Sequence, residues 1–169
     1  GQKSMSALMP HLLVDIMSLK KTDNAQLFGR ITPLLLNIAG RTPYLNLLLE
    51  NPGARRQLIH LCSKSPWIAN QIALFPLLLD ELLDPSYLHD QAEPVETVTK
   101  RLASHLQQSV LRIDPDDLEA MMNAWRQFKL CQQMLIAAAD ITNHLATSRV
   151  SDHLSALANV LVDATMRYA

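Results

Sequence analysis

The sequence predicts an all-α fold, and three observations carry that prediction. Leucine accounts for 31 of the 169 residues and glycine for only four, which favours helix because leucine loses little conformational freedom there. Aromatic residues, which favour strands together with β-branched ones, make up 5% of the chain. Residues 116–146 contain neither proline nor glycine. We expect a bundle of about eight helices, in which a short proline-punctuated hairpin part is followed by three longer helices.

The stretch 114–146 is predicted to be one long helix. Asp114 is a suitable N-cap, and Pro115 fits the first helical position. Further apolar residues lie beside the main apolar stripe, so we expect this helix to be covered on several sides, with the rest of the chain packed around it. The stripe recurs at intervals of three or four residues and consists of Leu118, Met121, Trp125, Phe128, Cys131, Leu135, Ala138, Ile141 and Leu145.

The N-terminal part, residues 4–85, begins with two predicted helices. Residues 4–19 follow an amphipathic pattern, and Pro10 should start or kink that helix. A second helix is predicted from its N-cap Asp23, with a bend at Pro33, to a stop at Gly40. Each of these helices has one apolar face to turn toward the core.

Three short helices are predicted next from one repeated signal, an N-cap side chain followed by proline. The cap oxygen accepts from an otherwise unpaired amide, and proline brings φ already set for the helix. A fourth start is expected at Pro76, and Pro85 ends the run because it cannot continue a helix. The three pairs are Thr42-Pro43, Asn51-Pro52 and Ser65-Pro66.

Two of these starts repeat each other. Residues 41–45 (RTPYL) match residues 64–68 (KSPWI) in residue class at every position. We interpret the match as a local duplication of a helical hairpin. Two such units are fewer than the three or more that a solenoid array needs for stability.

The C-terminal part, residues 94–169, carries the longer helices. Residues 85–93 show no useful periodicity and are predicted to be a surface loop. Pro94 opens an amphipathic helix, and Ser151 is the predicted N-cap of the last helix.

The two parts, 4–85 and 94–169, are expected to form a single helical domain over 1–169. The helical pattern is still unfinished at Ala169, which favours a piece of a longer polypeptide. Charged residues make up 18% of the chain, below the roughly 25% of an average soluble domain. Part of the surface is therefore expected to be covered by a neighbour.

Composition also excludes several partners. The formal net charge is −1, so no general electrostatic attraction to nucleic acid or to an anionic membrane is expected. The longest apolar runs are far shorter than the ~20 residues of a membrane span. Cys62 and Cys131 stand alone, which favours a reduced, cytoplasmic chain over a disulfide framework or a metal site.

The search for a catalytic centre in the sequence is negative. Asp152-His153 suggests acid and base work, but we prefer a capping role for an acidic residue in a first helical turn. Gly40 and Gly53 are isolated and form no phosphate loop. The histidines lack metal-ligand spacing, so we predict no catalytic, cofactor-binding or metal-binding residue in this chain. They are His11, His60, His89, His105, His144 and His153.

The remaining charged groups are interpreted as mostly solvated. An acidic cluster before a proline is more often solvated than a cation site, and an arginine pair at a helix start is more often solvated than a partner contact. Arg126 and Lys129 lie one turn apart and are available for acidic partners, with Asp140 available for an ion pair. The acidic cluster is Asp80, Glu81 and Asp84, and the arginine pair is Arg55-Arg56.

Several runs resemble one known family, the bacterial glutamine synthetase adenylyltransferase and adenylyl-removing enzyme. They occur in the family's order and spacing, and the resemblance covers about residues 4–168. It is weakest over 86–93 and 106–119. The runs are 9–13 (MPHLL), 65–69 (SPWIA), 76–85 (PLLLDELLDP), 126–129 (RQFK) with 136–141 (IAAADI), and 150–154 (VSDHL).

The resemblance implies a parent chain with two nucleotidyltransferase domains. The first removes AMP from a tyrosine of glutamine synthetase by phosphorolysis, and the second attaches AMP from ATP with magnesium. This chain resembles the helical region between them, and the family's GKLGG and SDxDL runs are absent from it. No catalytic or ATP-binding residue is carried over, so the chain alone is expected to be inactive and to contain no cofactor.

The resemblance also implies partners for a regulatory and connecting role. These are the parent's own nucleotidyltransferase domains, glutamine synthetase and the PII signal protein. The alternative from another class is an independent solenoid-like adaptor that binds a peptide or helix in a groove, which the local duplication favours. A GKLGG and SDxDL pair in the following ~60 residues of the reading frame, about one βαβ unit, would decide for the enzyme.

Overall fold

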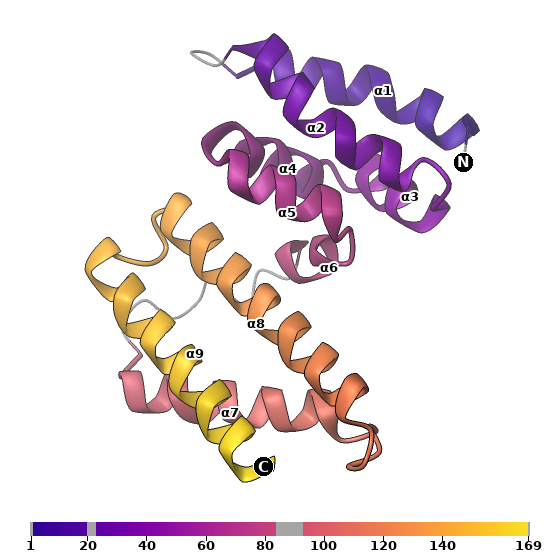
Figure 1. The fold of residues 1–169 in the computed structure, drawn as a ribbon. Helices are drawn as coiled ribbons and strands as arrows, with labels where there is room; N and C mark the ends of the chain where they lie inside the picture. Colours follow the sequence, from indigo (N-terminus) through magenta and orange to yellow (C-terminus); the bar gives the residue numbers. More distant parts are fainter. Residues whose placement is uncertain (1, 20–22, 84–92, 169) are drawn as a thin grey trace. The chain divides into compact units, whose positions relative to one another are not determined.

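A computed structural model describes residues 2–19, 23–83 and 93–168, without the side chains of 81–83. In these ranges helix is the only regular secondary structure, which confirms the predicted all-α class (Figure 1). The helices found there are α1 (Gln2–Met17), α2 (Asn24–Ile38), α3 (Thr42–Glu50), α4 (Pro52–Lys64), α5 (Pro66–Leu74), α6 (Leu78–Leu83), α7 (Val95–Val110), α8 (Leu118–Ile141) and α9 (Thr147–Tyr168).

The chain divides into two compact units, Gly1–Asp84 and Pro85–Ala169. The first unit contains α1 to α6, and the second contains α7 to α9. The predicted loop at 85–93 lies outside the described residues except for Glu93.

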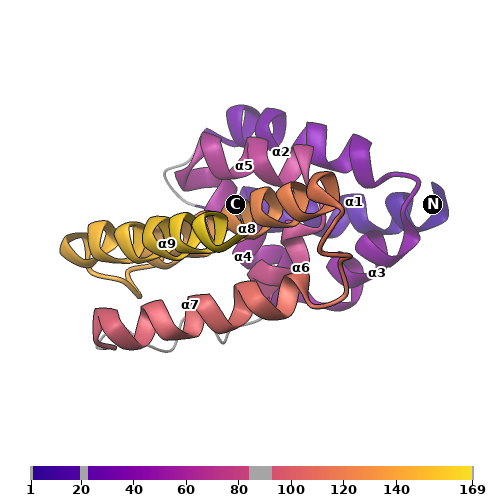
Figure 2. The ribbon, with the colours of Figure 1, turned by 60° about the horizontal axis from the view of Figure 1, so that its bottom comes forward.

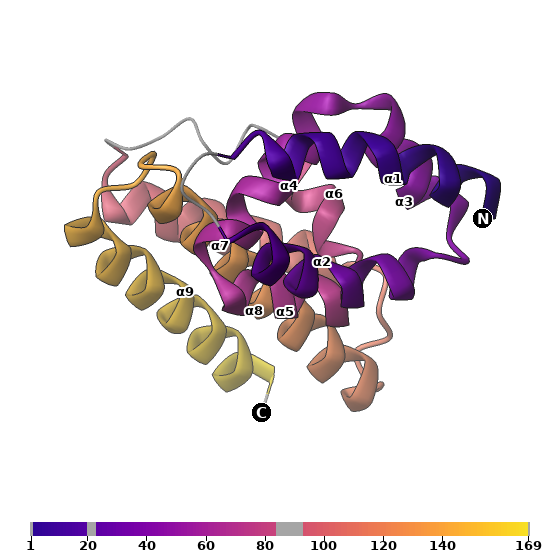
Figure 3. The same cartoon turned by 90° about the horizontal axis from the view of Figure 1, so that it is seen from above.

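The first unit is built from short helices around an aliphatic core. Its most extensive contacts are between α2 and α5 and between α1 and α3, while α4 contacts α1, α2, α3 and α5 (Figure 3). Fully buried side chains come from every one of the first five helices, which explains how helices of 9 to 16 residues remain folded. They include Leu8, Leu12, Leu27, Ile31, Leu45, Leu48, Leu58, Leu61, Ile68 and Ile72.

Three of the four predicted N-caps in this unit are confirmed. The Asp23 carboxylate accepts from the amides of Ala25 and Gln26 at the start of α2, at 3.0 and 3.1 Å. The side chains of Asn51 and Ser65 accept amide hydrogen bonds from the first turns of α4 and α5, at 3.1 and 3.2 Å. The predicted cap at Thr42 is wrong, because α3 already begins there and Arg41 takes the N-cap position without a side-chain bond. The two halves of the sequence repeat therefore start their helices differently.

Pro10 lies inside α1 and does not start that helix, and Pro33 lies inside α2, where the sequence predicts a bend. The predicted stop of α2 at Gly40 needs correction. Helix α2 ends at Ile38, and no described glycine has a positive φ, so Gly40 is not a left-handed stop. The last turn instead tightens, since the amide of Ala39 donates to a carbonyl three residues back.

The second unit is a three-helix arrangement in which α7 and α9 run in the same direction and α8 runs the opposite way (Figure 2). Helix α9 contacts both α7 and α8, and the most extensive contact is between α7 and α9. Its core cluster draws on all three helices and the turn before α9, and consists of Val98, Leu102, Leu106, Phe128, Ile136, Ala139, Leu145, Ala156, Leu157 and Val160.

The long helix is shorter than predicted. Helix α8 begins after Asp117, whose carboxylate accepts from the amide of Ala120 at 2.9 Å. Asp114 instead closes a turn by accepting from the amide of Asp116 at 3.0 Å. The helix ends at Ile141, before a left-handed residue at Asn143 with φ of 58°.

The apolar stripe of α8 is only partly inward. Met121, Phe128 and Cys131 are buried, whereas Leu118 at the first turn is 53% exposed and Trp125 is half-buried. Within the second unit α9 shares the central place that the sequence assigned to α8 alone.

The predicted start of the last helix is also wrong. Helix α9 begins at Thr147, so Ser151 lies one turn inside it and is not its N-cap. A serine within a regular amphipathic pattern gives no local signal that distinguishes a cap from an interior position.

Candidate functional site

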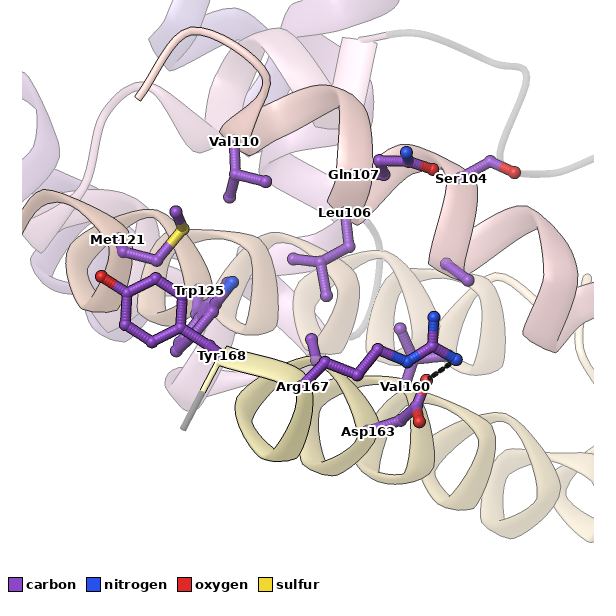
Figure 4. Close-up of a pocket in the computed structure, with 12 residues that line it drawn as sticks. Ser104, Leu106, Gln107, Val110, Met121, Trp125, Val160, Asp163, Arg167 and Tyr168 are labelled. Atoms are coloured by element: carbon purple, nitrogen blue, oxygen red, sulfur yellow. Dashed lines mark ion pairs between the residues drawn. The ribbon is translucent and has the colours of Figure 1, made fainter. Parts of the chain in front are cut away.

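A cavity of about 440 Å³ lies among α7, α8 and α9, toward the ends of α7 and α9 (Figure 4). Its inner surface is apolar because each helix turns core-facing side chains toward it. Those side chains are Leu106 and Val110 from α7, Met121 and Trp125 from α8, and Val160 and Ala164 from α9.

One end of the cavity is aromatic. The rings of Trp125 and Tyr168 meet edge to face, with centroids 5.4 Å apart and an interplanar angle of 90°. The Tyr168 hydroxyl donates to the carbonyl of Pro115 at 2.5 Å, in the turn before α8. This bond holds the last turn of α9 against the start of α8 and fixes the position of the phenol ring.

The rim of the cavity is polar. Ser104 and Gln107 reach it from α7, and Asp163 and Arg167 reach it from α9. The carboxylate of Asp163 and the guanidinium of Arg167 form an ion pair at 2.8 Å, drawn as a dashed line in Figure 4. The rim therefore offers donors and acceptors while its two charges cancel.

A second polar group lies where α7 and α9 begin, and we call it the start cluster: Glu93, Arg101, Arg149, Asp152 and His153. Arg149 donates to the backbone carbonyl of Glu93 at 2.6 Å, and Arg101 pairs with the Glu93 carboxylate at 3.0 Å. Asp152 lies 3.4 Å from Arg149. These contacts join the beginnings of two helices that are more than fifty residues apart in sequence.

Burial lowers the pKa of His153 below its ordinary value of 6.5, and the positive charges of Arg149 and Arg101 lower it further. Glu93 and Asp152 oppose this shift without cancelling it. The imidazole Nε2 is buried and has no hydrogen-bond partner among the described residues. A histidine held neutral in this way is a structural member of the cluster.

The structure replaces the predicted capping role of Asp152 with a different one. Asp152 lies in the second turn of α9, since the helix begins at Thr147, and it pairs with Arg149. No bond between Asp152 and His153 is found, and two arginines stand beside the histidine. The arrangement does not fit an acid and base pair.

Both interpretations of Arg55 are wrong. Its guanidinium is buried and pairs with the carboxylate of Asp15 on α1 at 2.5 Å, and it also donates to the carbonyl of Leu48 on α3 at 3.0 Å. Arg56, the next residue, is exposed as predicted. Arg55 is thus an internal tie between three helices.

The other candidate charges that the structure describes are exposed or half-buried. Asp80 is exposed, while the side chain of Glu81 and all of Asp84 lie outside the described residues. Lys129 is exposed, and Arg126 donates to Asn123 on its own helix at 3.1 Å. Asp140 accepts from the Thr147 hydroxyl at 3.2 Å.

Metal and thiol chemistry find no support in the described ranges. Across 2–19, 23–80 and 93–168, no group of three or more histidine, cysteine or acidic residues is placed to hold a metal ion, and His89 falls outside these ranges. Burial raises the pKa of Cys62 to about 12, so its thiol stays protonated and unreactive.

None of the helices described is long and apolar enough to cross a membrane.

Sequence reasoning did not find the cavity or the start cluster. Both depend on α7 and α9 running side by side. The start cluster joins segments separated by the whole of α8, and the cavity draws on all three helices. The one available signal was the polar face of each helix near its start, which alone is typical of solvent exposure.

Comparison with known proteins gives one consistent result. The family model described as glutamate-ammonia ligase adenylyltransferase matches residues 55–169. The bifunctional glutamine synthetase adenylyltransferase/adenylyl-removing enzyme of Shewanella frigidimarina is 47% identical over 163 residues, which are 96% of this chain and 16% of that protein. The enzymes of the same description from Shewanella oneidensis and Alteromonas mediterranea are 46% and 44% identical, over 100% and 96% of this chain. The chain spans about a sixth of the length of these relatives.

Proposed function

Because the chain belongs to the glutamate-ammonia ligase adenylyltransferase family, we propose that it is a helical regulatory and connecting region of an enzyme that adenylylates glutamine synthetase and removes the adenylyl group. The observation that carries the proposal is identity of 44 to 47% over nearly the whole chain to enzymes described by these two activities.

We infer that the magnesium–ATP site lies elsewhere in the longer protein. Magnesium in such sites is held by one or two carboxylates together with the phosphates, and the GKLGG and SDxDL runs that the family resemblance assigns to this task are absent from this sequence. The proposal therefore assigns AMP transfer, with its ATP and magnesium, to other regions of the longer protein. The chain's own residues build a helical scaffold.

Exposed apolar side chains support contact with those other regions. Val162 and Met166 are 55% and 74% exposed on one face of α9. An apolar face on an otherwise weakly charged chain is the kind of surface that a neighbouring domain covers. Glutamine synthetase and the PII signal protein are the further partners that this role would serve.

The independent adaptor is the weaker candidate. The duplicated hairpin that favoured it starts α3 and α5 with different caps. A match that runs across all of α1 to α9 is better explained by a region of the larger enzyme. The isolated cysteines also suit a cytoplasmic enzyme.

The test measures transfer of radiolabelled AMP from ATP to glutamine synthetase. The chain alone should transfer none, whereas the complete protein should transfer it. Adding the chain to the separately produced catalytic region should change the rate of adenylylation. AMP transfer by the chain alone would refute the assignment, and the absence of both binding and any rate change would refute the regulatory role.

A control variant tests the proposed contact surface. Val162→Ser with Met166→Ser should weaken binding to the catalytic region, because both apolar side chains are exposed on α9. Leu36→Ser, at a 72% exposed apolar residue of α2 in the first unit, is the control change outside α9. Equal weakening by both would contradict the proposed surface.

A further inference from the structure

We propose that the cavity among α7, α8 and α9 binds a small uncharged ligand that has an aromatic body and a hydrogen-bonding head such as a primary amide. The inference concerns the second unit alone and does not depend on the proposed adenylylation. It rests on the size, the apolar floor, the aromatic wall and the balanced rim of this cavity.

The cavity has the size of a ligand site. Its volume of about 440 Å³ falls within the range of roughly 300 to 1,000 Å³ that is common for small-molecule pockets. A single substituted ring fits such a space and leaves room for a short polar head. The floor is formed by core residues, of which Leu106, Met121 and Val160 are buried.

The floor and wall favour an aromatic body. Transferring a ring from water onto this apolar floor is favourable in proportion to the area removed from water. The Trp125 and Tyr168 rings already stand at 90° to each other, and Tyr168 is anchored through its hydroxyl. An aromatic ligand meets a wall whose geometry is set in advance, so little entropy is lost in ordering it.

The rim favours an uncharged head. Gln107 carries both a donor and an acceptor, and Ser104 carries a hydroxyl that serves as either. Asp163 and Arg167 form an ion pair at 2.8 Å, so the rim carries no net charge that would attract an anion or a cation. A charged head would lose part of its hydration on entering the cavity without gaining an unpaired counter-charge at the rim.

The primary amide matches the rim on both sides. Its N–H donates to the Asp163 carboxylate or the Gln107 carbonyl, and its oxygen accepts from the Gln107 amide or from Arg167. Figure 4 shows Gln107 on α7 and Asp163 and Arg167 on α9, with Leu106 between the two helices.

The experiment uses phenylacetamide as the probe and the methyl groups of methionine as reporters. In the whole chain labelled at its methionine methyls, phenylacetamide should shift the Met121 resonance in a saturable way. Met122 is the matched control, since it follows on the same helix but is 38% exposed and does not line the cavity. Saturation at Met121 without a comparable shift at Met122 is the expected result.

A pair of variants tests the location. Ala164→Leu places extra volume in the cavity and should raise the Kd for phenylacetamide at least about tenfold, a change of ~1.4 kcal/mol. Ala158→Leu adds the same volume at an exposed position of α9 and should leave the Kd within about twofold. Unchanged binding in Ala164→Leu would overturn the proposal.

A rim variant and a charged probe complete the test. Gln107→Ala lies at an exposed position, so it should fold, and it should weaken phenylacetamide about fivefold through the loss of one hydrogen bond. Phenylacetate, with a charged head on the same body, should bind at least about tenfold more weakly than the amide. No saturable shift at Met121, or equal binding of the two probes, would overturn the assigned ligand class.

Discussion

The contacts that hold the helices together differ between the two units. In the first unit, polar side chains join one helix to another: the buried Arg55 pairs with Asp15, and the half-buried Arg30 donates to two carbonyls in the last turn of α4 at 3.2 and 3.0 Å. In the second unit, three longer helices share an apolar core, and its ion pairs lie toward the ends. The first unit therefore adds a buried ion pair to its aliphatic core, whereas the core cluster of the second unit is made of apolar residues.

The difference has a consequence for where a ligand can bind. In the first unit the Arg55 guanidinium is buried, whereas Asn37 of α2, which donates to the carbonyl of Ala73 on α5, is exposed. The second unit has ion pairs toward the two ends of α7 and α9 and a cavity near one of these ends. Each unit contains one tryptophan, Trp67 or Trp125, so unfolding of each is measurable separately after the other is replaced by phenylalanine.

The largest expected effect is in the first unit. Arg55→Met removes one partner of a buried ion pair and leaves the Asp15 carboxylate without compensation, which should cost about 3 to 5 kcal/mol of unfolding free energy. The measurement is urea unfolding followed through Trp67 in a Trp125→Phe background.

The double variant Asp15→Leu with Arg55→Met is the control for that prediction. It removes both charges from the tie and should recover most of the loss, because no buried charge is left unpaired. If the double variant is as unstable as the single one, the cost comes from packing of the arginine stem and the contrast between the units weakens.

The next effect is in the second unit. Trp125→Ala deletes a half-buried ring that contacts Tyr168 and should cost about 2 to 3 kcal/mol, less than a fully buried aromatic residue would. Thermal unfolding monitored by circular dichroism measures it, with Trp125→Phe expected to retain most of the stability. A loss below about 1 kcal/mol would show that the aromatic wall contributes little to the three-helix core.

A smaller effect separates the true caps from the false one. Ser65→Ala and Asn51→Ala should each cost about 1 kcal/mol, because each side chain accepts an amide bond at a helix start. Thr42→Ala should change the unfolding free energy by less than half of that, since Thr42 is not an N-cap. Equal losses at all three positions would mean that the sequence repeat is also a structural one.

These results show which features the sequence predicts and which it does not. The caps at Asn51 and Ser65 follow from two adjacent residues, and the helical class follows from composition and periodicity. The tie between Asp15 and Arg55 does not, because its partners are forty residues apart and each alone is a typical surface charge. The start of α8 was misplaced because Asp114 and Asp117 are both good caps, and only the turn between them selects the second.

The smallest effect is a dependence of the second unit's stability on pH. The pKa of His153 is lowered in the folded chain by burial and by Arg149 and Arg101, so the unfolded chain binds the proton more readily. The free energy of unfolding should therefore be constant above the ordinary pKa of 6.5 and fall as the pH drops from there toward the folded pKa.

His153→Gln should flatten this decline, whereas His105→Gln, at an exposed position of α7, should leave it unchanged. Urea unfolding of the Trp67→Phe variant, followed through Trp125 between pH 5 and 8, about the range where histidine titrates, measures the slope. A decline that survives in His153→Gln would assign it to other groups, and a rise in stability at low pH would show that Glu93 and Asp152 outweigh the arginines in the start cluster.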